Sequence, residues 1–220
     1  DSAAESLANQ MDMDGLELYK DVPNSVGAPG VAITTLEKYL QAGQKMTELG
    51  APKDSKRTMM INPAATTSIV NGLTGLFQST EQIAQQYEKG LMGIAAGFKW
   101  KEAVNIKRHT VGPLGSTPQV DGAAESGSTI STKGWTTAAA SRLLVGDIIT
   151  IADVYAVNPI TRESTGSLRQ FTVTANFSSD ASGNGELSIS PAIVTSGPYK
   201  NVNSQPADSA AILTFDAVSS

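Results

Sequence analysis

The chain has 220 residues, of which 40% are hydrophobic and 17% charged, and its formal net charge is −5 at pH 7. This balance is typical of a folded protein, because disordered chains are poorer in apolar residues and richer in charge. Cysteine is absent, which excludes a disulfide framework, a cysteine-ligated metal and a thiol nucleophile. The acidic excess argues against a basic nucleic-acid-binding face. No apolar run reaches the ~18 residues of a membrane-spanning helix.

The sequence begins inside a helical pattern. Four apolar residues recur near the start at roughly helical spacing: Leu7, Met11, Leu16 and Leu18. No capping residue precedes them, and the far end of the chain stops just after an apolar strand pattern. We therefore expect the sequence to be an internal fragment of a longer protein.

A helix and a short strand follow. Thr34 or Thr35 can cap a helix that ends at Gly50, where glycine suits the left-handed conformation. Residues 57–61, RTMMI, then predict a short strand. Helices and strands in such close succession predict an α/β or α+β layer.

Two more helices are predicted beyond this strand. Asn62 supplies an N-cap and Pro63 a first helical position, which together start a helix. Ser79 and Gln82 form a capping box for the next helix, and Gly90 ends it.

Residues 87–100, YEKGLMGIAAGFKW, combine glycines with aromatic residues. Glycine allows close backbone approach or a positive φ, so we interpret the stretch as a bend between the helix ending at Gly90 and a strand starting near Phe98. The candidate structural turn consists of Tyr87, Gly90, Gly93, Gly97, Phe98 and Trp100.

The helical patterns end at Pro113, and β-type patterns replace them. In FTVTANF, Phe171 and Val173 fall on one face and Thr172 on the other, as expected of a half-buried strand. Four to six such short strands predict a small antiparallel barrel or sandwich. The sequence thus predicts an α+β protein with an all-β second domain. The predicted strands lie within residues 146–157, 168–177, 185–194 and 210–218.

The sequence offers few groups for catalysis. His109 is the only histidine, and we interpret it as a structural residue. No glycine-rich phosphate loop is present. We therefore predict no catalytic residue, no metal site and no cofactor, and we do not expect an enzyme.

The chain also resembles the major capsid (coat) proteins of short-tailed phages, the gene-product-five coat family. The likeness is collinear from Leu7 onward, and no single motif carries it. The segments that carry it are INPAATTSIVNGLTGLF, QYEKGLMGIAAGFKW, HTVG, GWTTAAASRLLVGDIITIADVYAVNPITRESTGSLRQFTVTA and SPAIVTSGPYKNV.

The resemblance implies a fold and a function. Residues 1–113 would hold the end of the spine helix and an axial-domain segment of the Hong Kong 97 capsid fold, and residues 114–220 an inserted antiparallel β-barrel domain. The protein would self-assemble with its own copies into the icosahedral shell that encloses the DNA of a phage or prophage. Scaffolding and portal proteins would assist assembly in the host bacterial cytoplasm, and the capsid of the virion would be its final location. Neither sequence-specific nucleic-acid binding nor a membrane partner is implied.

Residues 115–128, GSTPQVDGAAESGS, have the composition of an exposed loop. By resemblance the loop would reach a neighbouring subunit, with Asp121 and Glu125 as its only charges; a plain solvated connector is the alternative. For the whole chain, the alternative function is a β-rich adhesive or carbohydrate-binding module, because serine- and threonine-rich β domains often serve such roles.

Overall fold

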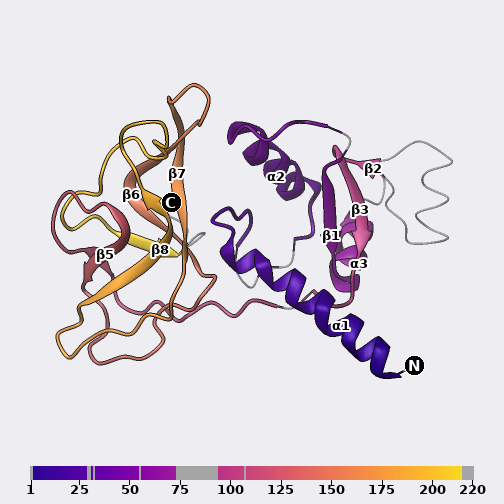
Figure 1. Cartoon of the computed structure of the whole chain (residues 1–220), viewed down its shortest axis with the longest axis horizontal. Helices are drawn as coiled ribbons and strands as arrows, with labels where there is room; N and C mark the ends of the chain where they lie inside the picture. Colours follow the sequence, from indigo (N-terminus) through magenta and orange to yellow (C-terminus); the bar gives the residue numbers. More distant parts are fainter. Residues whose placement is uncertain are drawn as a thin grey trace. The chain divides into compact units, whose positions relative to one another are not determined.

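The computed structural model describes residues 2–28, 31, 33–54, 56–72, 94–106 and 108–214. The chain divides into two compact units, which we treat separately (Figure 1). The first unit is Asp1–Glu17 with Gly30–Arg108, and the second, which we call the β domain, is Leu18–Pro29 with His109–Ser220. The predicted division at residues 113/114 into a shell segment and an inserted domain stays a prediction.

The first unit combines helices with a small sheet. The helices are α1 (Ser2–Glu17), α2 (Leu36–Glu48) and α3 (Pro63–Gly72). The strands are β1 (Thr58–Ile61), β2 (Ile94–Ala95) and β3 (Phe98–Glu102), in the order β1-β3-β2. Strand β1 runs parallel to β3, whereas β2 runs antiparallel to it.

Local sequence explains how these helices begin and end. The Asn62 side chain accepts the N–H of Ala65 at 2.7 Å, so the predicted cap of α3 is confirmed. Thr35 stands at the N-cap of α2 but makes no side-chain capping bond, and Gly50 follows that helix with a φ of 83°. The helix predicted to start at Ser79 lies outside the described residues.

The core of the first unit lies between the helices and the sheet. It joins one residue of α2, one of α3 and three of the strands: Tyr39, Ile69, Ile61, Phe98 and Trp100. Tyr39 meets Trp100 edge to face with ring centroids 5.0 Å apart. Helix α1 buries none of its residues, so its apolar spacing does not correspond to a packed face.

The β domain is a six-stranded antiparallel sheet in the order β4-β5-β8-β7-β6-β9. Figure 1 shows β5 to β8 curving around a common interior. The outermost strands also meet, because the N–H of Val120 donates to Ala210 and that of Ile212 to Pro118, both at 2.9 Å. The sheet is therefore nearly closed. Its strands are β4 (Gln119–Val120), β5 (Gly127–Lys133), β6 (Ile148–Val157), β7 (Ser164–Val173), β8 (Gly185–Ile193) and β9 (Ile212–Thr214).

Apolar residues from every strand fill the interior of this sheet. Fifteen buried residues form one cluster: Val120, Ile130, Trp135, Leu143, Ile149, Ile151, Val154, Phe171, Val173, Phe177, Leu187, Ile189, Ile193, Val202 and Ile212. The predicted all-β character of this region agrees with the described residues beyond 113, which contain strands and no helix.

The predicted alternation between a buried and a solvent-facing side holds for Phe171 and Val173, which are buried, but fails at Thr172. Gln170 and Thr172 point away from the apolar interior, yet only 3% and 1% of their surfaces are exposed. Residues 18–28, which we call the strap, cover this outer face of β7: Thr172 donates its hydroxyl to the Lys20 carbonyl at 3.2 Å. The strap begins with the 3-10 helix Leu18–Asp21. A face that the sequence marks as solvent-facing is thus buried by a segment from the start of the chain.

Candidate functional site

Two carboxylates share one ammonium group at the surface of the β domain. Lys133, the last residue of β5, places its Nζ 2.8 Å from Asp208 Oδ1 and 3.2 Å from Asp121 Oδ1. Asp121 directly follows β4, and Asp208 precedes β9. The N–H of Gly122 also donates to Asp208 at 3.0 Å. We call Asp121, Lys133 and Asp208 the Lys133 cluster.

The Lys133 cluster carries more negative than positive charge. The hydrogen bond from Lys133, followed by that from the Gly122 N–H, lowers the pKa of Asp208 from 3.8 to about 2. The same bond to Asp208, followed by that to Asp121, raises the pKa of Lys133. Two carboxylates against one ammonium leave a surplus negative charge, and the Asp121 and Asp208 side chains are 49% and 54% exposed. The cluster can therefore accept a further cationic group.

The loop predicted at residues 115–128 is partly ordered as sheet. Gln119 and Val120 form β4, and Val120 is fully buried, so the prediction of an exposed loop was wrong at this point. A single apolar residue, Val120, was enough to make this segment part of the sheet, because pairing with β5 directs its side chain into the interior. Asp121 is exposed and Glu125 half-buried. In the described part of the chain no hydrogen bond or ion pair joins these two carboxylates.

The candidate structural turn is described only at its end. Tyr87, Gly90 and Gly93 lie outside the described residues. Ala96 and Gly97 connect β2 to β3 with φ angles of 54° and 80°, the positive values that a tight two-residue hairpin turn requires.

The strand after this hairpin buries its aromatic residues. Phe98 and Trp100 point into the core of the first unit, while Lys99 between them is exposed. A Cβ at Gly43 of α2 would lie 3.3 Å from the Phe98 ring, so the small residue lets the helix approach the sheet closely. The described part of this stretch has an architectural role, because it packs the first unit.

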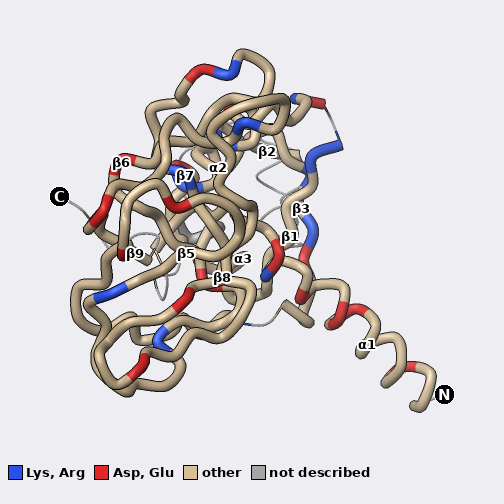
Figure 2. Tube along the Cα trace, turned by 60° about the vertical axis from the view of Figure 1, so that its left-hand side comes forward, with Lys and Arg blue, Asp and Glu red and all other residues tan. Residues whose placement is uncertain are grey.

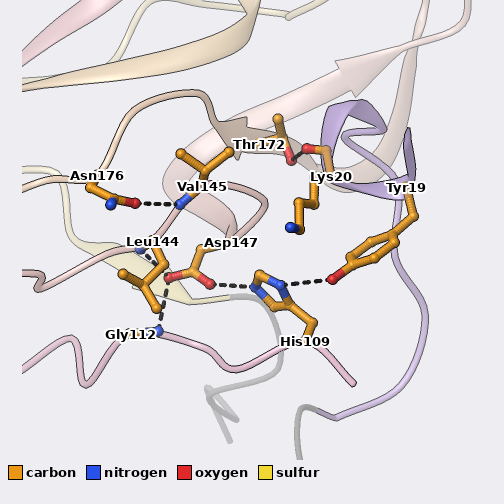
Figure 3. A network of polar contacts seen from close by, with 9 residues as sticks. All are labelled: Tyr19, Lys20, His109, Gly112, Leu144, Val145, Asp147, Thr172 and Asn176. Atoms are coloured by element: carbon orange, nitrogen blue, oxygen red, sulfur yellow. Dashed lines mark hydrogen bonds and ion pairs between the residues drawn. The ribbon is translucent and has the colours of Figure 1, made fainter. Parts of the chain in front are cut away.

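His109 belongs to a chain of polar contacts inside the β domain (Figure 3). Its Nε2 donates to Asp147 Oδ1 at 2.7 Å, and its Nδ1 lies 3.1 Å from the Tyr19 hydroxyl. The other Asp147 oxygen accepts the N–H of Gly112 at 3.0 Å and that of Leu144 at 2.8 Å. The Asp147 side chain is completely buried, and that of His109 is 21% exposed.

This arrangement is suited to holding chain segments together. Both ring nitrogens of His109 are engaged by protein groups, which fixes the orientation of the imidazole. Asp147 satisfies two backbone N–H groups, that of Gly112, which is buried, and that of Leu144, which is partly buried. The geometry agrees with the interpretation of His109 as a structural residue.

The described residues contain neither a metal cluster nor a membrane helix. No group of three or more His, Asp or Glu among them could hold a metal ion. Within the same residues, no helix has the length and apolar character needed to cross a membrane.

Sequence reasoning missed Lys133, Asp208 and Asp147 as contributors to these networks. Lys133 and Asp208 are 75 residues apart, and His109 and Asp147 are 38 apart. No local spacing joins residues at such separations, because the folded sheet alone brings them together. Figure 2 shows acidic and basic residues interspersed along the trace of the β domain, so charge patterning does not mark these positions either.

Comparison with known proteins gives the family. A family model described as "P22 coat protein - gene protein 5" matches residues 4–218. Among solved structures, the CUS-3 coat protein I-domain is 28% identical, covers 44% of this chain and 93% of its own, and has a TM-score of 0.33. A search of curated proteins finds no match. Because the family model spans nearly the whole sequence, the chain belongs to the P22 coat protein family and is a structural protein of a bacteriophage capsid.

Proposed function

We propose that this protein self-assembles with copies of itself into the icosahedral shell that encloses phage DNA. The observation that carries the proposal is the family match over residues 4–218. Closed shells repeat the same contacts by symmetry, so modest interfaces on each subunit add up to a stable particle. Scaffolding and portal proteins act as partners during assembly in the bacterial cytoplasm, and the virion capsid is the final location.

The fold proposal has two parts. Residues 1–113 contribute the end of a spine helix and an axial-domain segment of a Hong Kong 97-type fold, and residues 114–220 form a domain inserted into it. The mixed character of the first unit and the nearly closed sheet of the second support this division. In this scheme the turn at Ala96 and Gly97 shapes the axial domain.

The loop of residues 115–128 is proposed as a contact with a neighbouring subunit. Asp121 supports this role because its side chain stays half-exposed although Lys133 lies 3.2 Å away. The surplus negative charge of the Lys133 cluster supports it too, since a lysine or arginine of another copy would complete the pairing. Glu125 adds a second acidic group to the same loop.

The β domain offers little support for the alternative function, a carbohydrate-binding module. Sugar sites of that kind need aromatic faces that are open to solvent. Trp135, Phe171 and Phe177 are instead buried in the interior of the sheet, where they stabilise the domain.

Electron microscopy of the full-length protein, coexpressed with its scaffolding partner, tests the proposal. We expect closed particles of uniform size. A monodisperse monomer that binds a glycan in an array screen, and forms no particles with scaffold present, would contradict shell assembly and favour the adhesive function.

A further inference from the structure

The strap, residues 18–28, is attached to the β domain by polar contacts. The Ser25 N–H donates to Gln170 Oε1 at 2.9 Å, and the Gln170 amide donates back to the Ser25 carbonyl at 3.1 Å. Thr172 bonds the Lys20 carbonyl, and Tyr19 bonds His109. Three of these four contacts use backbone groups of the strap. Figure 3 shows the last two, at Lys20 and Tyr19.

The strap adds nothing to the apolar interior of the β domain. The interior cluster and the partly buried residues packed against it include no strap residue. The apolar side chains of Leu18 and Val22 remain 63% and 48% exposed, and those of Pro23, Val26 and Ala28 are half-buried. The two buried residues of β7 that bond to the strap, Gln170 and Thr172, are polar.

These contacts make release of the strap a low-cost event. Leaving the β domain would expose polar groups, which water can hydrogen-bond, and would uncover no hydrophobic interior. Elements held in this way open locally, well before the whole domain unfolds.

Release would change how the two units are connected. Within these 220 residues the chain passes from one unit to the other at 17/18, 29/30 and 108/109. The first two passages flank the strap. Once the strap is free, it becomes a linker inside the first unit, and the passage at 108/109 is the one described connection that remains.

We propose that the strap is a releasable latch. When the strap is docked on β7, three chain passages connect the β domain to the first unit. When it is undocked, one of these passages remains. The recognised groups are mainly backbone groups, of the 3-10 helix at Lys20 and of the segment at Ser25, so the seat binds the strap with little regard to its side chains. The latch does not depend on shell assembly and is testable on the isolated 220-residue chain.

Amide exchange on this chain tests local release. Two hydrogen-bonded amides serve as reporters: Ser25, held by Gln170, and Val173 in β7, held by the Asp147 carbonyl at 2.8 Å. We expect Ser25 to exchange at least a hundredfold faster than Val173 after correction for intrinsic rates, because the strap opens alone. Equal corrected rates would show that strap and sheet open together and would overturn the proposal.

Tyr19→Phe tests whether the strap leaves as a unit. The variant removes the hydroxyl that bonds His109 and keeps the ring, so the β domain stays intact. We expect exchange at Ser25, which binds elsewhere on the domain, to rise roughly two- to tenfold, as for the loss of one hydrogen bond. An unchanged rate at Ser25 would overturn a concerted latch.

Trypsin cleavage after Lys20 gives a second readout. Gln170→Ala removes both bonds to Ser25 and should speed this cleavage severalfold under native conditions. Gln119→Ala is the matched control, because that β4 side chain makes no hydrogen bond in the described structure; it should leave the rate unchanged. Equal cleavage in both variants would argue against the latch.

Discussion

Asp147 binds His109 through one carboxylate oxygen, at 2.7 Å, and two backbone N–H groups through the other. The contacts join the segment that enters the β domain to the turn before β6. The carboxylate is fully buried. Water therefore cannot reach it, and protein groups supply its hydrogen bonds instead. One side chain thus satisfies three donors at a junction of chain segments.

Asp147→Ala should destabilise the β domain by about 2–4 kcal/mol. The substitution removes the acceptor of the buried Gly112 N–H and of the partly buried Leu144 N–H, and a buried group left without a partner costs about 1–3 kcal/mol. The free energy of opening at buried β6 and β7 amides, from native-state exchange, measures the loss. Glu186→Ala, at an exposed position of β8, is the control and should change it by less than about 0.5 kcal/mol. Similar values for both variants would contradict the role of Asp147.

Lys133→Met should raise the pKa of Asp208. Asp208 titrates at about 2 because Lys133 and the Gly122 N–H stabilise its charged form. Removing the ammonium should move this titration to higher pH, because the strongest interaction with the charged form is lost. The side-chain carboxyl shift of Asp208, followed by NMR against pH, reports the change. Lys200→Met changes a lysine that makes no ion pair with Asp208 in the described structure and should leave the titration in place.

The ion pair between Lys133 and Asp208 also predicts how the stability of the fold changes at low pH. The folded-state pKa of Asp208 lies below its ordinary value of 3.8. Its stabilising contribution is therefore fully present above about pH 4 and is lost as the pH falls through about 2. Lys133→Met should reduce this dependence between pH 4 and 2. An identical pH dependence in parent and variant would show that the pair contributes nothing to folding.

Arg57→Met should destabilise the first unit by about 2–4 kcal/mol. The buried guanidinium donates to the carbonyls of Pro52, Gly43 and Ala51, near the end of α2. Methionine keeps an apolar stem but removes the donor to the Pro52 and Ala51 carbonyls. The Gly43 carbonyl keeps its bond from the Thr47 hydroxyl at 2.9 Å. Amide exchange in α2 measures the effect, and Lys56→Met, at the exposed neighbouring residue, is the control. Equal exchange in the two variants would contradict this assignment.

Asp121→Ala combined with Glu125→Ala should lower the yield of closed shells and leave the melting temperature of the monomer unchanged. Exposed ion pairs contribute little in one molecule, whereas a shell repeats the contact many times. Particle counts by electron microscopy measure the yield. Glu163→Ala with Glu186→Ala removes the same charge from exposed sites elsewhere and should leave the yield unchanged. Equal yields from both double variants would reduce residues 115–128 to a connector.

Local rules predicted the elements whose signals lie within a few residues. The cap at Asn62, the start of β3 at Phe98 and the positions of β6 and β8 follow from hydrogen-bonding residues, glycine or alternating apolar residues. Strand β7 was predicted within residues 168–177 but spans Ser164–Val173. Strand β5 escaped prediction because it is rich in glycine, serine and threonine, and β4 because two residues are too few to show a pattern. Their place depends on pairing with β8 and β9.

Long-range contacts could not be predicted. Ser25 and Gln170 are 145 residues apart, and Lys20 and Thr172 are 152 apart. The residues of β7 that bind the strap are polar, so no apolar pattern in the sequence marks them. The strap is bound mainly through its backbone, so its side chains do not mark it either. Asp121 was visible as a loop charge, but its partner Lys133 was not, because the pairing of β4 with β5 creates that proximity.

The meeting of β4 and β9 has a consequence for the proposed shell, in which copies of this protein would lie side by side. An open sheet ends in rows of unpaired backbone donors and acceptors, onto which identical strands can add without limit. Here the bonds between Val120 and Ala210, and between Ile212 and Pro118, occupy such groups. In such a shell, contacts between β domains would be made by side chains, which can determine which subunit is bound and at what angle. Closure of the sheet by backbone hydrogen bonds thus prevents strand-by-strand aggregation into fibres. The arrangement of neighbouring subunits then depends on the surface side chains.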